Sequence, residues 1–509
     1  MAESKTSTSG DFDLNKHQVI TSAAAGVEVN TGGHSKAQEL LAHHHVDFDP
    51  DSAEAKRVLR KIDMRLMPMI FMIYLLQLMD KNSLSFAAIM GIRQDANLTP
   101  SQYSWLGSIV YFGYLGGDIP ATFFMQRIPL AKYLASMCML WGIVVAMHAV
   151  CHNFGSLAAV RFLLGAIEVC TAPGVIYITS SWYTKREQVT RVALWYTTSG
   201  WAAVFGGFFS WAIYHANTFK WQGLFVLYGA LTFVTGLILF SLLAASPTEA
   251  NWLTEEEKVI ALERVRGNKT GTEVLKFNRA QLKEAFMDVR FYMMFLLLVS
   301  TGLPNGGVTA FGPTIISGFG YDTKTTTLLS MGPGAAQVAG TFLALGVAKY
   351  TNRTIAGIWT LFLACTGATM MLAIDEKHIA ARYGGYVLTM QFPICVLFII
   401  TFMTGGVGGS TKKFAFGVAY QLGYAVGNII GPQTFRQDDA PEYYTAKYTM
   451  LAFLIFTGIV IGIYGCIHKY WNSKRQIIDA EPSDDGLHME NEEFADITDF
   501  KMKAFQYPV

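Results

Sequence analysis

The sequence predicts an all-α membrane protein with twelve transmembrane helices in two six-helix halves. Of its 509 residues, 52% are hydrophobic and only 15% are charged, which is too apolar for an ordinary soluble protein. Apolar stretches of about 20 residues, the length of a helix that crosses the hydrocarbon core of a bilayer, recur along the chain. One long charged segment, which begins "ASPTEANWLTEEEK", separates six such stretches from six more.

The predicted membrane helices follow one another with short polar connections between them. No cleavable signal peptide precedes them, because the residues before the first stretch are polar, so the first helix serves as its own insertion signal. In chain order the twelve predicted helices cover residues 66–89, 102–124, 131–151, 157–180, 191–214, 223–245, 290–317, 325–348, 354–374, 383–404, 412–434 and 447–469.

The remaining segments complete the predicted organisation. Residues 1–63 are rich in Ser, His and Gly, and residues 472–509 are acidic, so both are predicted to be disordered cytoplasmic tails. Residues 64–246 form the N-terminal six-helix half and residues 290–471 the C-terminal half. Residues 247–289 form a charged cytoplasmic linker with a helical pattern.

The orientation in the membrane follows from the basic residues in the short connections. Connections on one side hold Lys and Arg with almost no acid, whereas those on the other side carry several acids, and basic loops face the cytoplasm. Both termini are therefore predicted to be cytoplasmic. The basic residues in question are Arg127, Lys132, Lys185, Arg186, Lys349, Arg353, Lys412 and Lys413.

Signatures of soluble catalysis are absent from the sequence. It contains no phosphate-binding G-x-x-x-x-G-K-[ST] loop, no G-x-S-x-G elbow and no H-E-x-x-H motif. The six cysteines show no paired spacing, and His43, His44 and His45 lie in a polar tail without Cys or acid at ligand spacing. The sequence thus predicts neither an enzyme, nor an ATP-driven pump, nor a metal site.

Four charged residues stand out inside the predicted membrane helices: Asp80 and Lys81 in "LLQLMDKNSLSFAAIMG", and Arg161 and Glu168 in "RFLLGAIE". Each costs about 3 kcal/mol at the centre of a membrane helix, so such residues usually mark a pathway, a proton site or a bound ion. Neighbours on a helix point about 100° apart, so at most one of Asp80 and Lys81 faces a cavity squarely. Arg161 and Glu168 share a helix face but lie about 10 Å apart along the axis, so each needs another partner.

Structural roles for these charges remain open. Arg161 begins its apolar run and is either a clamp onto neighbouring helix ends or a direct contact to an anion. Glu168 either pairs structurally with Lys81 or takes up a proton, which a buried carboxyl group can do. Asp118 lies at the end of the second helix, where a packing or gating contact is favoured over transport chemistry.

Several polar side chains are stranded in apolar stretches and are candidates to line a binding cavity. Buried amides also bond neighbouring helices, so a structural role competes with binding for each of them. These candidates are Tyr111, Tyr114, Trp195, Asn305, Gln337, Gln391, Gln421 and Asn428.

Asn305 stands in "TGLPNGGVTAFGP", where the prolines and glycines are expected either to interrupt the helix and free backbone carbonyls or to permit close packing. Gly423, Gly427 and Gly431 recur every four residues and predict a face on which another helix approaches closely.

The chain also resembles a known family. The motifs "MDKNSLSFA", "RFLLGAIE" followed by "APG", "SSWYTKREQVTRVALW" and "FGPTII" resemble the major facilitator superfamily, and within it the anion:cation symporter family and its fungal allantoate permease-like branch. The resemblance covers about residues 55–475. It departs from the superfamily pattern in "GGDIPATFFMQRIPLAK", where the basic residues after the second helix are reduced to two, so the gating role of that loop is in doubt.

The resemblance implies the major facilitator fold and alternating access, with a proton as coupling ion and no other cofactor. It implies proton sites at Asp80 and Glu168 and anion recognition by Lys81 or Arg161. The implied substrate is a small organic anion such as allantoate, ureidosuccinate, nicotinate, pantothenate or biotin. The expected partners are this anion and the lipid bilayer, without nucleic acid, in a monomer of the plasma membrane. An exporter of drugs or toxins and a non-transporting nutrient receptor remain alternatives.

Overall fold

The computed structural model describes residues 52–509 except 185–186, 188–190, 192–193, 217–219, 267–277, 481–497 and 501–504. Within this part of the chain, each of the twelve predicted membrane ranges coincides with one helix or with two consecutive helices. Nine of these are long and apolar enough to cross a membrane by length and composition. The other three, α4 (Pro100–Arg127), α9 (Thr198–Ala216) and α19 (Ser410–Ile430), hold more glycine, hydroxyl and aromatic residues in place of aliphatic ones.

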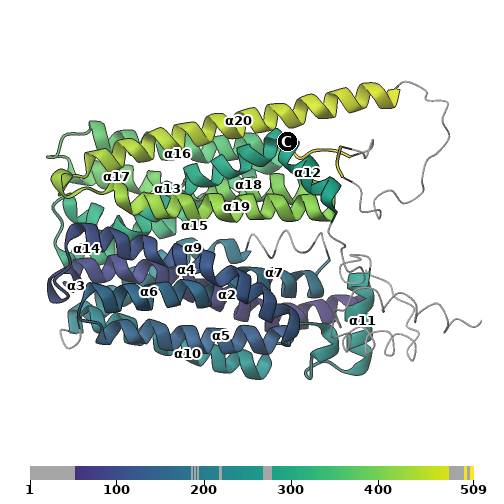
Figure 1. The fold of residues 1–509 in the computed structure, drawn as a ribbon, viewed down its shortest axis with the longest axis horizontal. Helices are drawn as coiled ribbons and strands as arrows, with labels where there is room; N and C mark the ends of the chain where they lie inside the picture. Colours follow the sequence, from purple (N-terminus) through teal and green to yellow (C-terminus); the bar gives the residue numbers. More distant parts are fainter. Residues whose placement is uncertain are drawn as a thin grey trace, which may run out of the picture.

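The helices form two halves, stacked one above the other in Figure 1. The N-terminal half further contains α2 (Ala53–Ile89), α3 (Ile92–Asp95), α5 (Leu130–Met147), η1 (His148–Val150), α6 (Phe154–Glu168), α7 (Thr171–Trp182) and α10 (Trp221–Leu242). The C-terminal half further contains α13 (Val289–Gly318), α14 (Thr323–Leu329), α15 (Met331–Tyr350), α16 (Arg353–Ala373), α17 (Ile379–Thr389), α18 (Ile394–Gly406), η3 (Gly431–Thr434), η4 (Gln437–Asp439) and α20 (Tyr444–Ala480).

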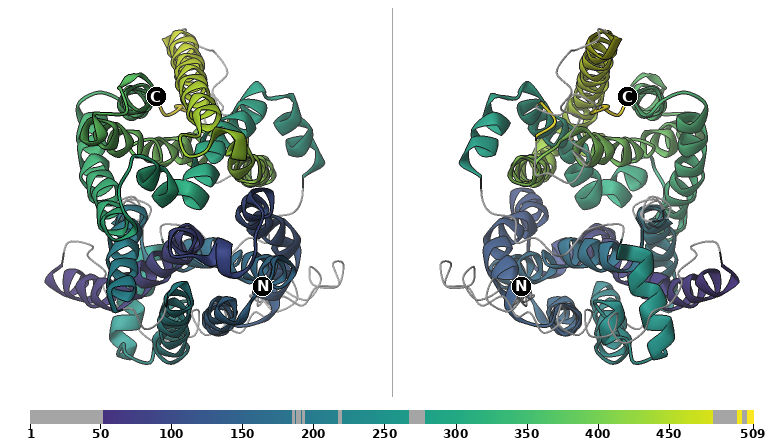
Figure 2. Two further views of the ribbon diagram at one scale, coloured as in Figure 1. Left: turned by 90° about the vertical axis from the view of Figure 1, so that its left-hand side faces the viewer. Right: turned by 90° about the vertical axis from the view of Figure 1, so that its right-hand side faces the viewer.

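The connection between the halves contains η2 (Pro247–Glu249), α11 (Glu255–Arg266) and α12 (Arg279–Met287). Both α11 and α12 lie at the same end of the molecule (Figure 1), which we call the linker end; the opposite end is the far end. Viewed from either end, the two halves face each other across a central interface (Figure 2).

Each linker helix is attached to its own half. Ion pairs join α11 to the N-terminal half, with 2.5 Å between Lys61 Nζ and Glu257 Oε2 and 2.7 Å between Arg264 Nη2 and a Glu187 oxygen. A hydrogen bond joins α12 to the C-terminal half: the Gln281 side-chain oxygen accepts from the backbone N–H of Thr411 at 3.0 Å. The linker therefore has one anchor on each half.

Helix starts are set by local sequence. Thr99 and Gln102 form a capping box at the start of α4, with Pro100 in the first turn. Asn153 and Asn352 cap α6 and α16 by accepting from the backbone N–H three residues on. These caps satisfy amide groups that the helix itself leaves free.

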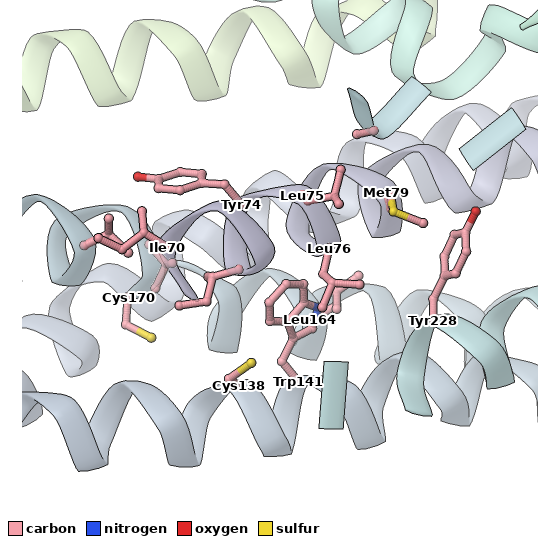
Figure 3. Packing of buried hydrophobic residues seen from close by; sticks show 14 of the residues in the cluster. Ile70, Tyr74, Leu75, Leu76, Met79, Cys138, Trp141, Leu164, Cys170 and Tyr228 are labelled. Carbon is pink, nitrogen blue, oxygen red and sulfur yellow. The ribbon is translucent and has the colours of Figure 1, made fainter. Parts of the chain in front are cut away.

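Interdigitating apolar side chains fill the N-terminal half (Figure 3). Ile70, Leu76 and Met79 of α2 lie in one buried cluster with Trp141 of α5 and Leu164 of α6. In a membrane such packing stabilises by van der Waals contact rather than by removal of apolar surface from water.

Glycines bring selected helices into backbone contact. A Cβ added at Gly427 of α19 would lie 2.5 Å from the carbonyl oxygen of Val299 on α13, and one at Gly431, the first residue of η3, would lie 2.3 Å from that of Leu303. The close-approach face predicted from the four-residue spacing is thus confirmed. Of the two alternatives for "TGLPNGGVTAFGP", an interrupted helix is wrong, since α13 is continuous with Pro304 and Pro313 inside it. Close packing is the alternative that the structure supports, since a Cβ added at Gly306 would lie 2.6 Å from the carbonyl oxygen of Asn428.

Glycines also lie where the two halves meet. A Cβ added at Gly200 of α9 would lie 2.5 Å from the carbonyl oxygen of Gly334 on α15, and the reverse distance is 2.4 Å. No side chain can stand between the two backbones at this point, so the halves touch along main chain.

Hydrogen bonds join the halves at the far end. The Tyr103 hydroxyl of α4 donates to the carbonyl oxygen of Ala310 on α13 at 2.6 Å. The Ser108 hydroxyl donates to that of Ile429 at 2.7 Å and accepts from the Gln433 amide at 3.1 Å. These contacts hold the far end closed in this conformation.

A charged cluster stabilises the far end of the C-terminal half. Glu442 accepts from Arg382 and from Lys447, the latter at 2.8 Å, and Arg382 is only 2% exposed. Both cations also lie against the ring of Phe319. The cluster ties α17 to the start of α20.

The predicted tails differ from the structure at their inner boundaries. Helix α2 begins at Ala53 with Ser52 as its cap, inside the range assigned to the N-terminal tail. At the other end α20 continues to Ala480, and residues 498–500 and 505–509 lie against the C-terminal half. Composition assigned these stretches to the tails because they are polar, although several of their polar groups, such as those of Lys61, Asn472 and Asp499, have partners in the fold.

Candidate functional site

A cavity of about 140 Å³ lies between the two halves in the middle of the membrane helices. Its lining on the N-terminal side includes Lys81 and Asn82 of α2 and Ser199 of α9. On the C-terminal side it includes Asn305 of α13 and Gln337 of α15. The predicted residues Lys81, Asn305 and Gln337 therefore come together from three separate helices.

Lys81 is the cation of this cavity. Its ammonium nitrogen lies 3.3 Å from Glu168 Oε1 on α6, and the side chains are 14% and 0% exposed respectively. The nitrogen also lies 4.9 Å from the ring centre of Tyr114, whose hydroxyl donates to the same carboxylate oxygen. The other oxygen, Oε2, has no hydrogen-bond partner in the described chain. Glu168 thus connects a cavity-lining cation to the interior of the N-terminal half.

Asp80 points away from the cavity, as the 100° between neighbours requires. It is 1% exposed, and neither of its carboxylate oxygens has a hydrogen-bond partner in the described chain. Arg161 is 2% exposed, and its Nε and Nη2 lack partners there as well. Arg161 lies within electrostatic range of both Asp80 and Glu168. These three charges form a buried group inside the N-terminal half, and Arg161 does not line the cavity.

An amide cluster forms the C-terminal wall of the site. Asn305 donates to the Tyr424 hydroxyl at 3.0 Å and to Asn428 Oδ1 at 2.8 Å, and Asn428 in turn donates to the Tyr424 carbonyl at 2.7 Å. Gln337 donates to the Ser199 hydroxyl at 3.0 Å, across the boundary between the halves. Asn428 is fully buried and ties α13 to α19, whereas Asn305 and Gln337 both tie helices and line the cavity.

The aromatic candidates pack beside the cavity without lining it. Tyr111 stacks on Tyr114, with 6.0 Å between ring centres, and meets Tyr424 edge-on at 6.2 Å. Trp195 stacks on Tyr74 with 4.4 Å between ring centres. These rings support the residues that reach the cavity.

The remaining amide candidates also lie outside the cavity lining. Gln391 is buried against α15, where its oxygen occupies the space beside Gly340. Gln421 is half-buried on α19. For Gln391 the structure favours a packing role over a binding role.

Polar residues beyond those predicted from the sequence contribute to the site, and Ser85, Thr309, Ser330 and Tyr386 are among those that line the cavity. Asn82, Ser199 and Tyr424 line the cavity, and Gln77 donates to the Tyr114 hydroxyl at 3.2 Å. Asn82 directly follows Lys81, and Gln77 precedes Lys81 by one helical turn, so both could have been found from their spacing. The serines gave no signal, because hydroxyls are common in membrane helices.

The described residues contain no group of three or more His, Cys, Asp or Glu side chains that could hold a metal ion. The arrangement instead offers one accessible ammonium group, buried carboxylates and a wall of amide and hydroxyl groups. This combination can bind a small anion and exchange protons.

The Major Facilitator Superfamily model matches residues 70–432. An uncharacterized transporter of Schizosaccharomyces pombe is 33% identical over 91% of this chain and 91% of its own length. The allantoate permease of Saccharomyces cerevisiae is 31% identical over 92% of this chain and 89% of its own. Among solved structures, a bacterial homolog of the human lysosomal transporter Spinster, in an inward-facing conformation, has a TM-score of 0.57 and 13% identity, covering 81% of this chain and 97% of that one.

Proposed function

Because the chain belongs to the major facilitator superfamily, and within it to the fungal branch that includes allantoate permease, we propose that it carries a small organic anion into the cell together with a proton. Membership itself makes the protein a secondary transporter with several membrane passes, and not an enzyme. The observation that carries the proposal is Lys81, which lines the cavity between the halves and pairs with the buried Glu168.

Proton binding and anion binding are coupled because Glu168 and the substrate compete for Lys81. When Glu168 is ionised, it holds the ammonium group as an internal partner. When Glu168 takes up a proton, Lys81 loses that partner and is free to pair with the carboxylate of a substrate. Proton and anion then favour each other's binding, which is the thermodynamic requirement for symport.

Asp80 is the second proton site of this proposal. Its carboxylate is buried without a hydrogen-bond partner in the described chain, and Arg161 lies in electrostatic range of it. Arg161 keeps its charge under all ordinary conditions. In this role Arg161 acts through the carboxylates rather than by touching the anion.

The cavity supports a compact substrate. A volume of about 140 Å³ is close to the roughly 150 Å³ of an engineered protein cavity that holds one benzene molecule. The C-terminal wall offers amide and hydroxyl groups from Asn305, Gln337 and Tyr424. A carboxylate of one ring or a short chain with amide or ring nitrogen, such as nicotinate, allantoate or ureidosuccinate, suits this lining.

Transport proceeds by alternating access, in which the halves rock around the central site. In this conformation the far end is bonded across the halves through Tyr103 and Ser108. We place the linker end and both termini in the cytoplasm, because the basic connections gather on that side. The protein acts as a monomer in the plasma membrane.

The test is an uptake screen in cells that express the protein, with labelled allantoate, ureidosuccinate, nicotinate, pantothenate and biotin. We expect one of these to accumulate faster when the outside is acidified, and Lys81→Ala to abolish its accumulation while Lys132→Ala, at the linker end, does not. Efflux under the same gradient would identify an exporter instead. Binding without net flux would identify a receptor.

A further inference from the structure

Residues 498–500 and 505–509, which we call the strap, lie in a groove at the linker end of the C-terminal half. The groove is formed by side chains from four helices that are distant in sequence: Glu284 of α12, Arg290 of α13, Lys412 of α19, and Trp471 and Arg475 of α20. Every contact of the strap described below is made with this half or with its linker helix. The groove is separate from the central cavity.

Asp499 is the central residue of the strap. It is fully buried, and its carboxylate lies 2.5 Å from Arg290 Nη2 and 3.0 Å from Lys412 Nζ. It also accepts from the backbone N–H of Gly408 at 3.1 Å. Burial would raise the pKa of Asp499, but Arg290 and Lys412 outweigh this and hold the pKa below its ordinary value. The carboxylate is therefore matched to a preformed cationic site.

The charge balance of the groove depends on Asp499. The groove contributes three cations, Arg290, Lys412 and Arg475, and two carboxylates, Asp288 and Glu284. With Asp499 docked there are three charges of each sign. Without it one positive charge is left uncompensated, which is costly because Arg290 and Lys412 are fully buried, although Arg475 is only half-buried.

Aromatic side chains of the strap also contact the groove. The Tyr507 hydroxyl donates to Asp499 Oδ2 at 3.0 Å, and its ring stacks on His468 with 5.0 Å between centres. Trp471 meets the ring of Phe500 edge-on at 5.5 Å, and the guanidinium of Arg290 lies 4.6 Å from the Trp471 ring. An acidic residue followed by rings is thus the pattern that the groove selects.

The strap backbone is held as a bound peptide would be. Tyr507 exchanges two hydrogen bonds of 2.9 Å with the side chain of Asn472. The Val509 carbonyl accepts from the backbone N–H of Arg353 at 3.0 Å, and the Pro508 carbonyl accepts from His468 Nδ1 at 2.6 Å. These bonds do not depend on the identity of most strap side chains.

We propose that this groove is a peptide-binding surface for an acidic and aromatic segment, that the chain's own strap is its occupant, and that occupancy fixes the linker ends of α13 and α19. Asp499 bridges Arg290 on α13 and Lys412 on α19. The same two helices carry Asn305 and Tyr424 to the central cavity. The strap therefore sets the spacing of the C-terminal wall of the cavity from outside the membrane centre.

The test is hydrogen exchange of the purified full-length protein. In Asp499→Asn we expect the backbone amides of Arg353 and Tyr507 to exchange about tenfold faster or more, because the charge-assisted bonds that seat the strap are lost. The amide of Tyr443 at the far end should not change. Tyr507→Phe, which removes only a hydroxyl, should give a smaller acceleration at the same amides. Glu255→Gln, an exposed carboxylate on α11, is the matched control and should change neither.

A synthetic peptide of residues 498–509 added to the Asp499→Asn protein should restore slow exchange at Arg353, and the same peptide with Asn in place of Asp499 should not. Unchanged exchange at Arg353 and Tyr507 in the variant would overturn the docking of the strap. Acceleration throughout the chain would show a general loss of fold instead of release from a groove. Failure of the peptide to restore protection would refute an exchangeable peptide site. None of these readouts requires substrate, so they are independent of the proposed transport function.

Discussion

Replacing Glu168 by glutamine separates proton coupling from anion binding. Glutamine keeps the size of the side chain and removes the charge that lies 3.3 Å from Lys81. At an effective dielectric constant of about 20, the attraction lost over this distance is about 5 kcal/mol. A buried cation left without its partner costs about 3 to 5 kcal/mol, and an anion that enters the cavity regains part of this. Coupling free energies between two sites are typically about 1 to 3 kcal/mol, so we expect anion affinity to rise about 5- to 150-fold.

The assay is binding and transport by the purified variant in lipid vesicles at an acidic and at a neutral pH. The wild type should bind the anion more tightly at the acidic pH and accumulate it along an inward proton gradient. Glu168→Gln should bind tightly at both pH values and exchange labelled for unlabelled substrate, yet fail to accumulate it. Glu376→Gln, which alters an exposed glutamate at the far end, is the matched control and should behave as the wild type.

Two results would contradict this reasoning. A folded variant that still accumulates substrate with the pH dependence of the wild type would remove Glu168 from the coupling mechanism and leave Asp80 as the candidate. A variant that unfolds without any gain in affinity would assign the pair of Lys81 and Glu168 a structural role.

Three further predictions concern residues around the site. Arg161→Ala should lower the free energy of unfolding by about 3 to 5 kcal/mol, because Asp80 is left buried without a compensating charge; a stable variant that has lost only anion affinity would show direct anion contact. Ser108→Ala removes the hydrogen bond to Ile429 and should favour opening of the far end by about 1 kcal/mol, which is about a fivefold change in the open population. The measurement is the rate at which a cysteine placed at the far end is labelled, which should rise. An unchanged rate would exclude this bond from the gate. Burial would raise the pKa of Glu442, but its two basic partners hold the pKa below its ordinary value. The stability that Glu442 contributes is therefore complete above about pH 4.3 and is lost as the pH falls through the lower folded pKa; thermal unfolding of Glu442→Gln should lack this acid-dependent step.

The positions of most membrane helices along the chain could be predicted from the sequence because the length of apolar stretches determines them. The proximity of Lys81 and Glu168 was within reach for the same reason, since an isolated charge in a membrane needs a partner. The choice among the amides was not predictable. Asn305 and Gln391 have the same chemistry, and only the rotation of each helix decides which of them reaches the cavity.

The ordered parts of the tails could not be predicted, because amino-acid composition gives the average polarity of a segment and does not show which residues it will contact. The segment around Asp499 is acidic and polar, as disordered chains are, yet its carboxylate meets two cations that lie 209 and 87 positions away in the chain, Arg290 and Lys412. Such long-range complementarity leaves no local signal. Whether α13 continues through Pro304 could not be decided from the sequence, since neighbouring helices can compensate for the hydrogen bond that a proline removes.

The contact of Gly200 with Gly334 has a mechanical consequence. Because neither glycine has a side chain, the main chains of α9 and α15 can touch here, and no side chain of these two residues opposes the turning of one half against the other. The barrier to turning then arises from the hydrogen bonds that must break between the halves, both at the far end and between Gln337 and Ser199 beside this contact. A methyl group here would collide with the facing carbonyl oxygen and slow each cycle of transport, and because Gly334 lines the cavity it would also disturb that part of the wall.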